Sequence, residues 1–82
     1  MLEFLNDNTI QDPDTGIVVQ VYINPIALQD YEPYEDFFVT QDFKGKEVMA
    51  VWLNYDKNLR AKGDIIINNA LAYFIAHNTD KI

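Results

Sequence analysis

Residues 17–23 read Ile-Val-Val-Gln-Val-Tyr-Ile, which is the clearest β-strand pattern in the sequence. Every second residue from Ile17 to Ile23 is aliphatic, so an extended chain carries these side chains on one face and Gln20 and Tyr22 on the other. This alternation predicts a β-strand with one face on a hydrophobic core. The preceding Asp12-Pro13-Asp14-Thr15-Gly16 consists of turn-forming residues, so residues 3–11 are expected to fold back as a hairpin partner.

Two further strands are predicted on the C-terminal side. Residues 37–43 and 47–55 flank Lys44-Gly45-Lys46, a short glycine-containing loop that suits an antiparallel hairpin. In the second of these segments, both alternating sets are apolar, from Val48 to Leu53. A strand that is apolar on both faces is expected at the centre of a sheet.

A C-terminal helix is predicted from an N-cap at Asp64 to about His77. Apolar residues recur on one face of this helix, which should cover one face of the sheet. The stripe consists of Ile67, Ala70, Leu71, Phe74 and Ile75 and is widened by Ile66 and Tyr73. Because Ile65, Ile66 and Ile67 are β-branched, a strand ending at Ile67 with a helix from Asn68 is the alternative.

These elements predict an α+β fold: an antiparallel sheet of three to four strands with a C-terminal helix packed on one face. The 82 residues, 49% of them hydrophobic, indicate one small globular domain spanning residues 1–82. Without cysteine, the chain has no disulfide, thiolate zinc site or cysteine nucleophile. The N-terminus has no basic region or long apolar run, so no secretory signal is predicted and a cytoplasmic location is expected.

Charge is distributed unevenly along the chain. Residues 1–43 contain nine acidic side chains and no Lys or Arg, whereas residues 44–82 contain four acidic and six basic ones. The two halves therefore carry formal charges of −9 and +2. Because nucleic-acid phosphates and anionic lipids repel an acidic surface, we expect no direct nucleic-acid binding and no membrane binding through that half.

The densest chemical feature lies between the two predicted hairpins. Four carboxylates and two tyrosines there form the predicted partner-binding site: Asp30, Tyr31, Glu32, Tyr34, Glu35 and Asp36. Carboxylates steer a cationic partner toward the surface, while tyrosine rings supply stiff contact area with a hydroxyl at the tip. The competing interpretation is an ordinary solvated loop whose tyrosines fold onto the core.

Catalytic and metal sites are poorly supported. His77 is the only histidine, and the chain contains no serine, which excludes a Ser-His-Asp triad. The position of His77 near a helix C-terminus is explained by the helix dipole. Residues 12–16 resemble the start of a calcium loop, but glycine comes one position early and Ile23 stands where a bidentate glutamate is required, so a tight turn is predicted. We expect no enzyme activity, no cofactor and no metal ion.

The resulting hypothesis is a small acidic inhibitor of DNA-mimic type. It would cover a basic surface of a partner protein, such as a nuclease or another nucleic-acid-binding protein. Carboxylates spread along one face can imitate duplex DNA, which carries one negative charge per about 1.7 Å of its axis. Nuclease immunity proteins and phage-encoded antagonists of host defence use this physical strategy. The alternative is a structural or assembly subunit that forms a homodimer or larger homo-oligomer, because a small core gains from association.

Overall fold

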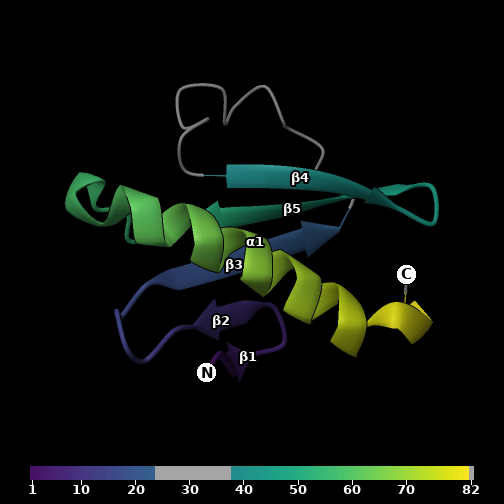
Figure 1. The fold of residues 1–82 in the computed structure, drawn as a ribbon. Helices are drawn as coiled ribbons and strands as arrows, with labels where there is room; N and C mark the ends of the chain where they lie inside the picture. Colours follow the sequence, from purple (N-terminus) through teal and green to yellow (C-terminus); the bar gives the residue numbers. More distant parts are fainter. Residues whose placement is uncertain (24–37, 82) are drawn as a thin grey trace.

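The computed structural model describes residues 1–23 and 38–81. These residues form an antiparallel sheet with a C-terminal helix on one face (Figure 1). The strands are β1 (Glu3–Asn6), β2 (Thr9–Gln11), β3 (Val18–Ile23), β4 (Phe38–Phe43) and β5 (Lys46–Trp52). A short 3-10 turn, η2 (Lys57–Leu59), leads into helix α1 (Arg60–His77), and η3 (Thr79–Lys81) follows it. The predicted α+β fold is confirmed.

The five strands lie in the order β1-β2-β3-β5-β4, and each neighbouring pair is antiparallel. The sheet has one strand more than expected because residues 3–11 form a hairpin of their own, which reverses at Asp7 and Asn8. Strand β5 is interior, as its two apolar faces predicted, although β3 occupies the middle position. The polar segment Asp12–Gly16 connects β2 to β3 as the predicted turn.

Helix α1 begins at Arg60, earlier than the predicted N-cap at Asp64. The capping carboxylate is instead Asp56, whose side chain accepts a hydrogen bond from the backbone N–H of Asn58 and so starts η2. The alternative strand at Ile65–Ile67 is wrong, since all three residues are helical. Ile67 is buried against the sheet whereas Ile65 is 64% exposed, so helical packing of Ile67 outweighs the weak β-preference of these side chains.

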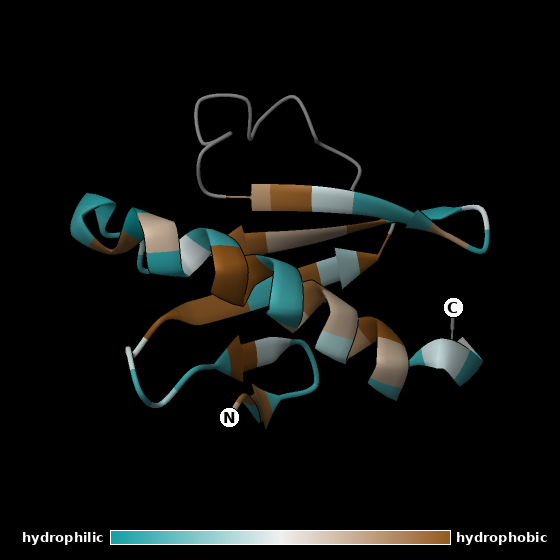
Figure 2. Ribbon diagram, viewed as in Figure 1, coloured by the Kyte–Doolittle hydropathy of each residue, from teal (hydrophilic) through white to brown (hydrophobic). Residues whose placement is uncertain are grey.

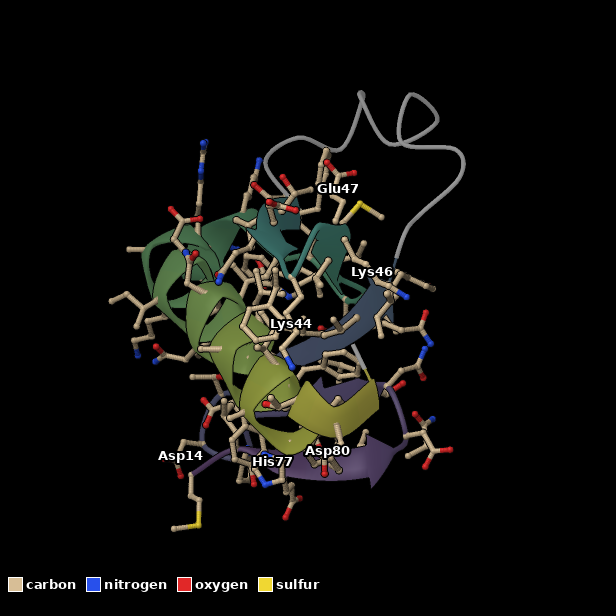
Figure 3. The ribbon with its side chains drawn as sticks, turned by 90° about the vertical axis from the view of Figure 1, so that its right-hand side faces the viewer. Asp14, Lys44, Lys46, Glu47, His77 and Asp80 are labelled. Carbon is tan, nitrogen blue, oxygen red and sulfur yellow. The ribbon has the colours of Figure 1, made fainter. Side chains whose placement is uncertain are left out.

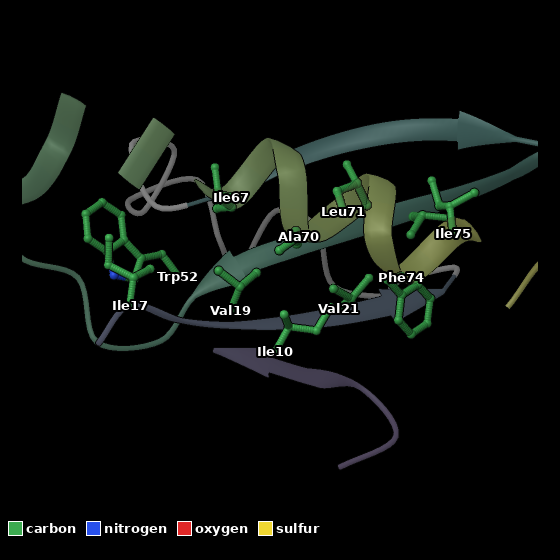
Figure 4. Close-up of a cluster of buried hydrophobic side chains, with 12 residues drawn as sticks. Ile10, Ile17, Val19, Val21, Trp52, Ile67, Ala70, Leu71, Phe74 and Ile75 are labelled. Carbon is green, nitrogen blue, oxygen red and sulfur yellow. The ribbon is translucent and has the colours of Figure 1, made fainter. Parts of the chain in front are cut away.

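The core lies between α1 and the helix-facing side of the sheet (Figure 4). All five residues of the predicted helical stripe are buried there, and Ile66 and Tyr73 pack at its margin. The sheet contributes the buried side chains Ile10, Ile17, Val19, Val21, Val48, Ala50 and Trp52. Figure 2 shows this hydrophobic layer on the inner strands and the middle of α1, with hydrophilic residues at the hairpin turns.

The β4–β5 hairpin closes with two residues rather than the predicted three. Lys44 and Gly45 have φ values of 53° and 80°, and Phe43 pairs with Lys46. Positive φ at both central positions is the requirement of a type I′ turn, whose twist matches that of the flanking strands. This turn sets the register of the whole hairpin and therefore decides which side chains of β4 and β5 face one another.

Candidate functional site

The predicted partner-binding residues lie between β3 and β4. Asp30, Tyr31, Glu32, Tyr34, Glu35 and Asp36 all fall outside the described residues. The prediction for this segment therefore stays a prediction.

The N-terminal acidic residues divide between the two ends of the sheet. Asp7 lies in the β1–β2 turn, whereas Asp12 and Asp14 lie in the β2–β3 connection, at the opposite end of strand β2. Asp12 is buried, and its carboxylate accepts a hydrogen bond of 2.8 Å from the Thr15 hydroxyl, so it stabilises the connection. Asp14 is exposed. These three acids do not form one continuous cluster.

The sheet face away from α1 carries acidic but no basic side chains at its described strand positions. Glu3 lies on edge strand β1, and Asp42 and Glu47 lie on β4 and β5 at the other edge. Asp42 and Glu47 are direct cross-strand partners. Like charges placed directly opposite one another on neighbouring strands repel and destabilise the pair. Asp42 and Glu47 thus form a pair of like charges on this face of the hairpin end, while Lys44 in the turn and Lys46 on the other face of β5 carry the neighbouring positive charges.

The sequence indicates the pairing of Asp42 with Glu47 only if the hairpin loop has two residues, and the predicted loop had three. A two-residue loop at Lys44-Gly45 places Asp42 opposite Glu47, whereas a loop of Lys44-Gly45-Lys46 shifts the register. Lysine is unusual at positive φ, where Asn, Asp or Gly is typical, so the type I′ signal was weak. Lys44 is held instead by its side chain, whose Nζ donates to the Thr79 carbonyl at 2.9 Å and lies over the Phe43 ring.

His77 belongs to an aromatic group at the C-terminal end of α1. Its ring centroid lies 4.3 Å from that of Tyr73 and 5.3 Å from that of Phe4, and the Phe4 and Tyr73 rings stack at 5.2 Å. His77 Nδ1 lies 2.8 Å from the Tyr73 carbonyl. Since a carbonyl only accepts, Nδ1 carries the proton, and Nε2 is the acceptor in the neutral ring.

A cleft of about 300 Å³ opens beside this aromatic group. It runs between the β1–β2 hairpin and the last turn of α1, at the end of the molecule shown in Figure 3. The lining residues are Phe4, Leu5, Asn6, Asp7, His77 and Asn78. The cleft joins apolar and aromatic surface to a single carboxylate, amide groups and an imidazole. It was not predicted, because Phe4 and His77 lie at opposite ends of the sequence.

The described part of the chain contains no group of three His, Cys, Asp or Glu side chains placed to hold a metal ion. Among the same residues, no helix has the length and apolar character needed to cross a bilayer. No protein-family model, no curated protein and no solved structure matches this chain. The site must therefore be interpreted from its own chemistry.

Proposed function

We propose that this chain is a small acidic protein-binding module of inhibitor type, which covers a basic, nucleic-acid-binding surface of a partner protein. The observation that carries the proposal is the direct cross-strand pair of Asp42 and Glu47 on a sheet face without described Lys or Arg positions. A cationic side chain of a partner placed between the two carboxylates would relieve their repulsion. Binding of a cation is therefore favoured at this pair.

The proposed binding surface combines this pair with the predicted residues Asp30 to Asp36. Strand β4 begins at Phe38, two residues after Asp36, and Asp42 lies near the other end of the same strand. Carboxylates distributed in this way would attract a partner whose cations otherwise meet nucleic-acid phosphates. Nuclease immunity proteins and phage antagonists of host defence are the functional classes that fit such a module.

Affinity capture from lysate of the source cells tests the proposal. We expect the immobilised chain to retain a basic nucleic-acid-binding protein that is released by raised salt and displaced by duplex DNA. Two variants should retain much less of it: one with Asp42→Asn and Glu47→Gln, and one with Asp30→Asn, Glu32→Gln, Glu35→Gln and Asp36→Asn. Asp14→Asn, which removes an exposed charge in the β2–β3 connection, is the matched control.

Equal retention by the control and both neutralised variants would contradict the proposal, as would a captured protein that duplex DNA fails to displace. Sedimentation over a range of concentrations distinguishes the proposed inhibitor from the alternative function, an assembly subunit. A salt-sensitive self-association of the wild-type chain that Asp42→Asn and Glu47→Gln leave unchanged would favour the homo-oligomeric assembly subunit.

A further inference from the structure

We infer that the cleft between the β1–β2 hairpin and the C-terminal end of α1 binds the guanidinium group of an arginine side chain presented by a protein partner. The inference rests on the proposed function for the source of that arginine, but it concerns a different site from the Asp42–Glu47 pair. Its evidence is the combination of charge, aromatic surface and helix polarity that surrounds the cleft.

The electrostatics of the cleft favour a cation. Asp7 supplies a carboxylate, and no lysine or arginine is among the residues that line the cleft. The last turn of α1 adds the partial negative charge of a helix C-terminus. The Thr79 carbonyl, in η3 directly after this helix, accepts a hydrogen bond from Lys44 Nζ at 2.9 Å. Figure 3 shows Lys44 toward β4 and β5 and His77 beside the β1–β2 hairpin, so the two lie on different sides of the helix end.

The shape and lining of the cleft favour a planar cation over a compact one. Phe4 and His77 present aromatic rings, on which a guanidinium group stacks more readily than the strongly hydrated lysine ammonium. Leu5, which is 51% exposed, gives the methylene groups of an arginine an apolar surface. The cleft volume of about 300 Å³ is sufficient for the end of one side chain, not for a large ligand.

Hydrogen-bond acceptors remain available around the cleft for the several N–H groups of a guanidinium. Asn78 Nδ2 donates to the Phe74 carbonyl, which leaves its Oδ1 as an acceptor beside the cleft. His77 donates from Nδ1 to Tyr73, which leaves Nε2 as the acceptor in the neutral ring. Together with the Asp7 carboxylate, these groups provide oxygen and nitrogen acceptors on both sides of the opening.

The experiment titrates the isotope-labelled chain with Nα-acetyl-arginine methylamide and follows the backbone amide resonances by NMR. We expect saturable shifts confined to residues 4–7 and 77–78, at the millimolar affinity typical of a single exposed side chain. The matched probe is the citrulline derivative, which has nearly the same shape but no charge, and it should cause no saturable shift. The lysine derivative should bind more weakly than the arginine derivative.

Two variants and one further probe complete the test. Asp7→Asn should raise the dissociation constant by about fivefold, whereas Asp14→Asn should leave it unchanged. Free arginine should bind no more tightly than the blocked derivative, because its additional ammonium and carboxylate groups have opposite effects beside Asp7; tighter binding of the free amino acid would overturn a protein arginine as the occupant. Equal shifts with arginine and citrulline derivatives, or shifts spread over all exposed acids, would overturn the inference.

The comparison of the arginine and citrulline derivatives needs no variant, so it stays decisive even if Asp7→Asn disturbs the hairpin. It also needs no partner protein. Failure of this titration therefore leaves the proposed function standing, while failure of the capture experiment leaves a demonstrated guanidinium site.

Discussion

The indole ring of Trp52, on strand β5, lies directly against the backbone of Gly63 in helix α1. A Cβ atom at Gly63 would overlap Cζ3 and Cη2 of that ring and would lie 2.8 Å from Cε3. Trp52 is 1% exposed and also packs edge-on against Tyr55, with ring centroids 4.8 Å apart. The glycine thus sets how closely the first turns of the helix approach the sheet.

Replacement of Gly63 by Ala should destabilise the protein. Alanine is better than glycine in a helix interior by about 1 kcal/mol, but overpacking of a buried ring costs about 1–3 kcal/mol and here meets a direct overlap. We expect a net loss of about 2 kcal/mol in the free energy of unfolding, measured by urea denaturation.

Asn69→Ala, at an exposed position of the same helix, is the control and should be neutral or slightly stabilising. In a Trp52→Phe background, the cost of Gly63→Ala should shrink, because the smaller ring leaves room for the new methyl group. An undiminished cost in that background would show that the ring is not what the methyl group meets.

The side chain of Asn54 joins the start of β3 to the end of β5. Its Oδ1 accepts from the Val18 N–H and its Nδ2 donates to the Gly16 carbonyl, each at 2.9 Å. Asn54→Ala removes both bonds and should lower the free energy of unfolding by about 1–2 kcal/mol. Asn54→Asp keeps the acceptor, yet it places a carboxylate beside the Gly16 carbonyl and should also destabilise. Amide hydrogen exchange at Val18 should become faster in both variants. Unchanged protection of the Val18 amide would show that the Asn54 side chain does not hold β3 and β5 together.

The type I′ turn at Lys44-Gly45 makes a separate prediction about backbone strain. Gly45 has φ of 80° and open space where a Cβ would stand, so Gly45→Ala meets strain without a steric clash. We expect a loss of about 1 kcal/mol in thermal or urea unfolding, smaller than that of Gly63→Ala. Gly45→Asn should lose less than Gly45→Ala, since asparagine tolerates positive φ. Equal losses for Asn and Ala would argue against a left-handed conformation at this residue.

The repulsion between Asp42 and Glu47 should oppose folding. Asp42→Asn should raise the free energy of unfolding by about 0.2–1 kcal/mol at low salt, because it removes a repulsion between direct cross-strand neighbours. The gain should fade as salt screens the two charges, since both lie at the surface. Glu47→Gln should act alike, and the double variant should gain no more than either single one. Strictly additive gains would show that the two carboxylates do not interact.

Local patterns were sufficient for most of the fold. Alternation in residues 17–23 predicted β3, the apolar faces of residues 47–55 predicted an interior strand, and a helical stripe from Ile67 to Ile75 predicted the packed face of α1. Each pattern reports a side-chain period that matches one type of backbone. The sequence also contains the charge division between the two halves, which predicts an acidic binding module.

Other features depended on residues far apart in the chain. Helix α1 begins at Arg60 and not after the predicted N-cap at Asp64, because packing of Gly63 against Trp52 favours a helical conformation at that residue. The pairing of Asp42 with Glu47 depends on a two-residue turn, in which Lys44 has a positive φ and donates to the distant Thr79 carbonyl.

By itself, then, the sequence determined the types of secondary structure, the composition of the core and the sign of the surface charge, because these follow from side-chain period and chemistry within short segments. Only the tertiary structure decided the strand register, the separation of Asp7 from Asp12 and the cleft between Phe4 and His77. Those features depend on which elements pack together, and the free energy of that packing comes from contacts between segments that no local pattern records.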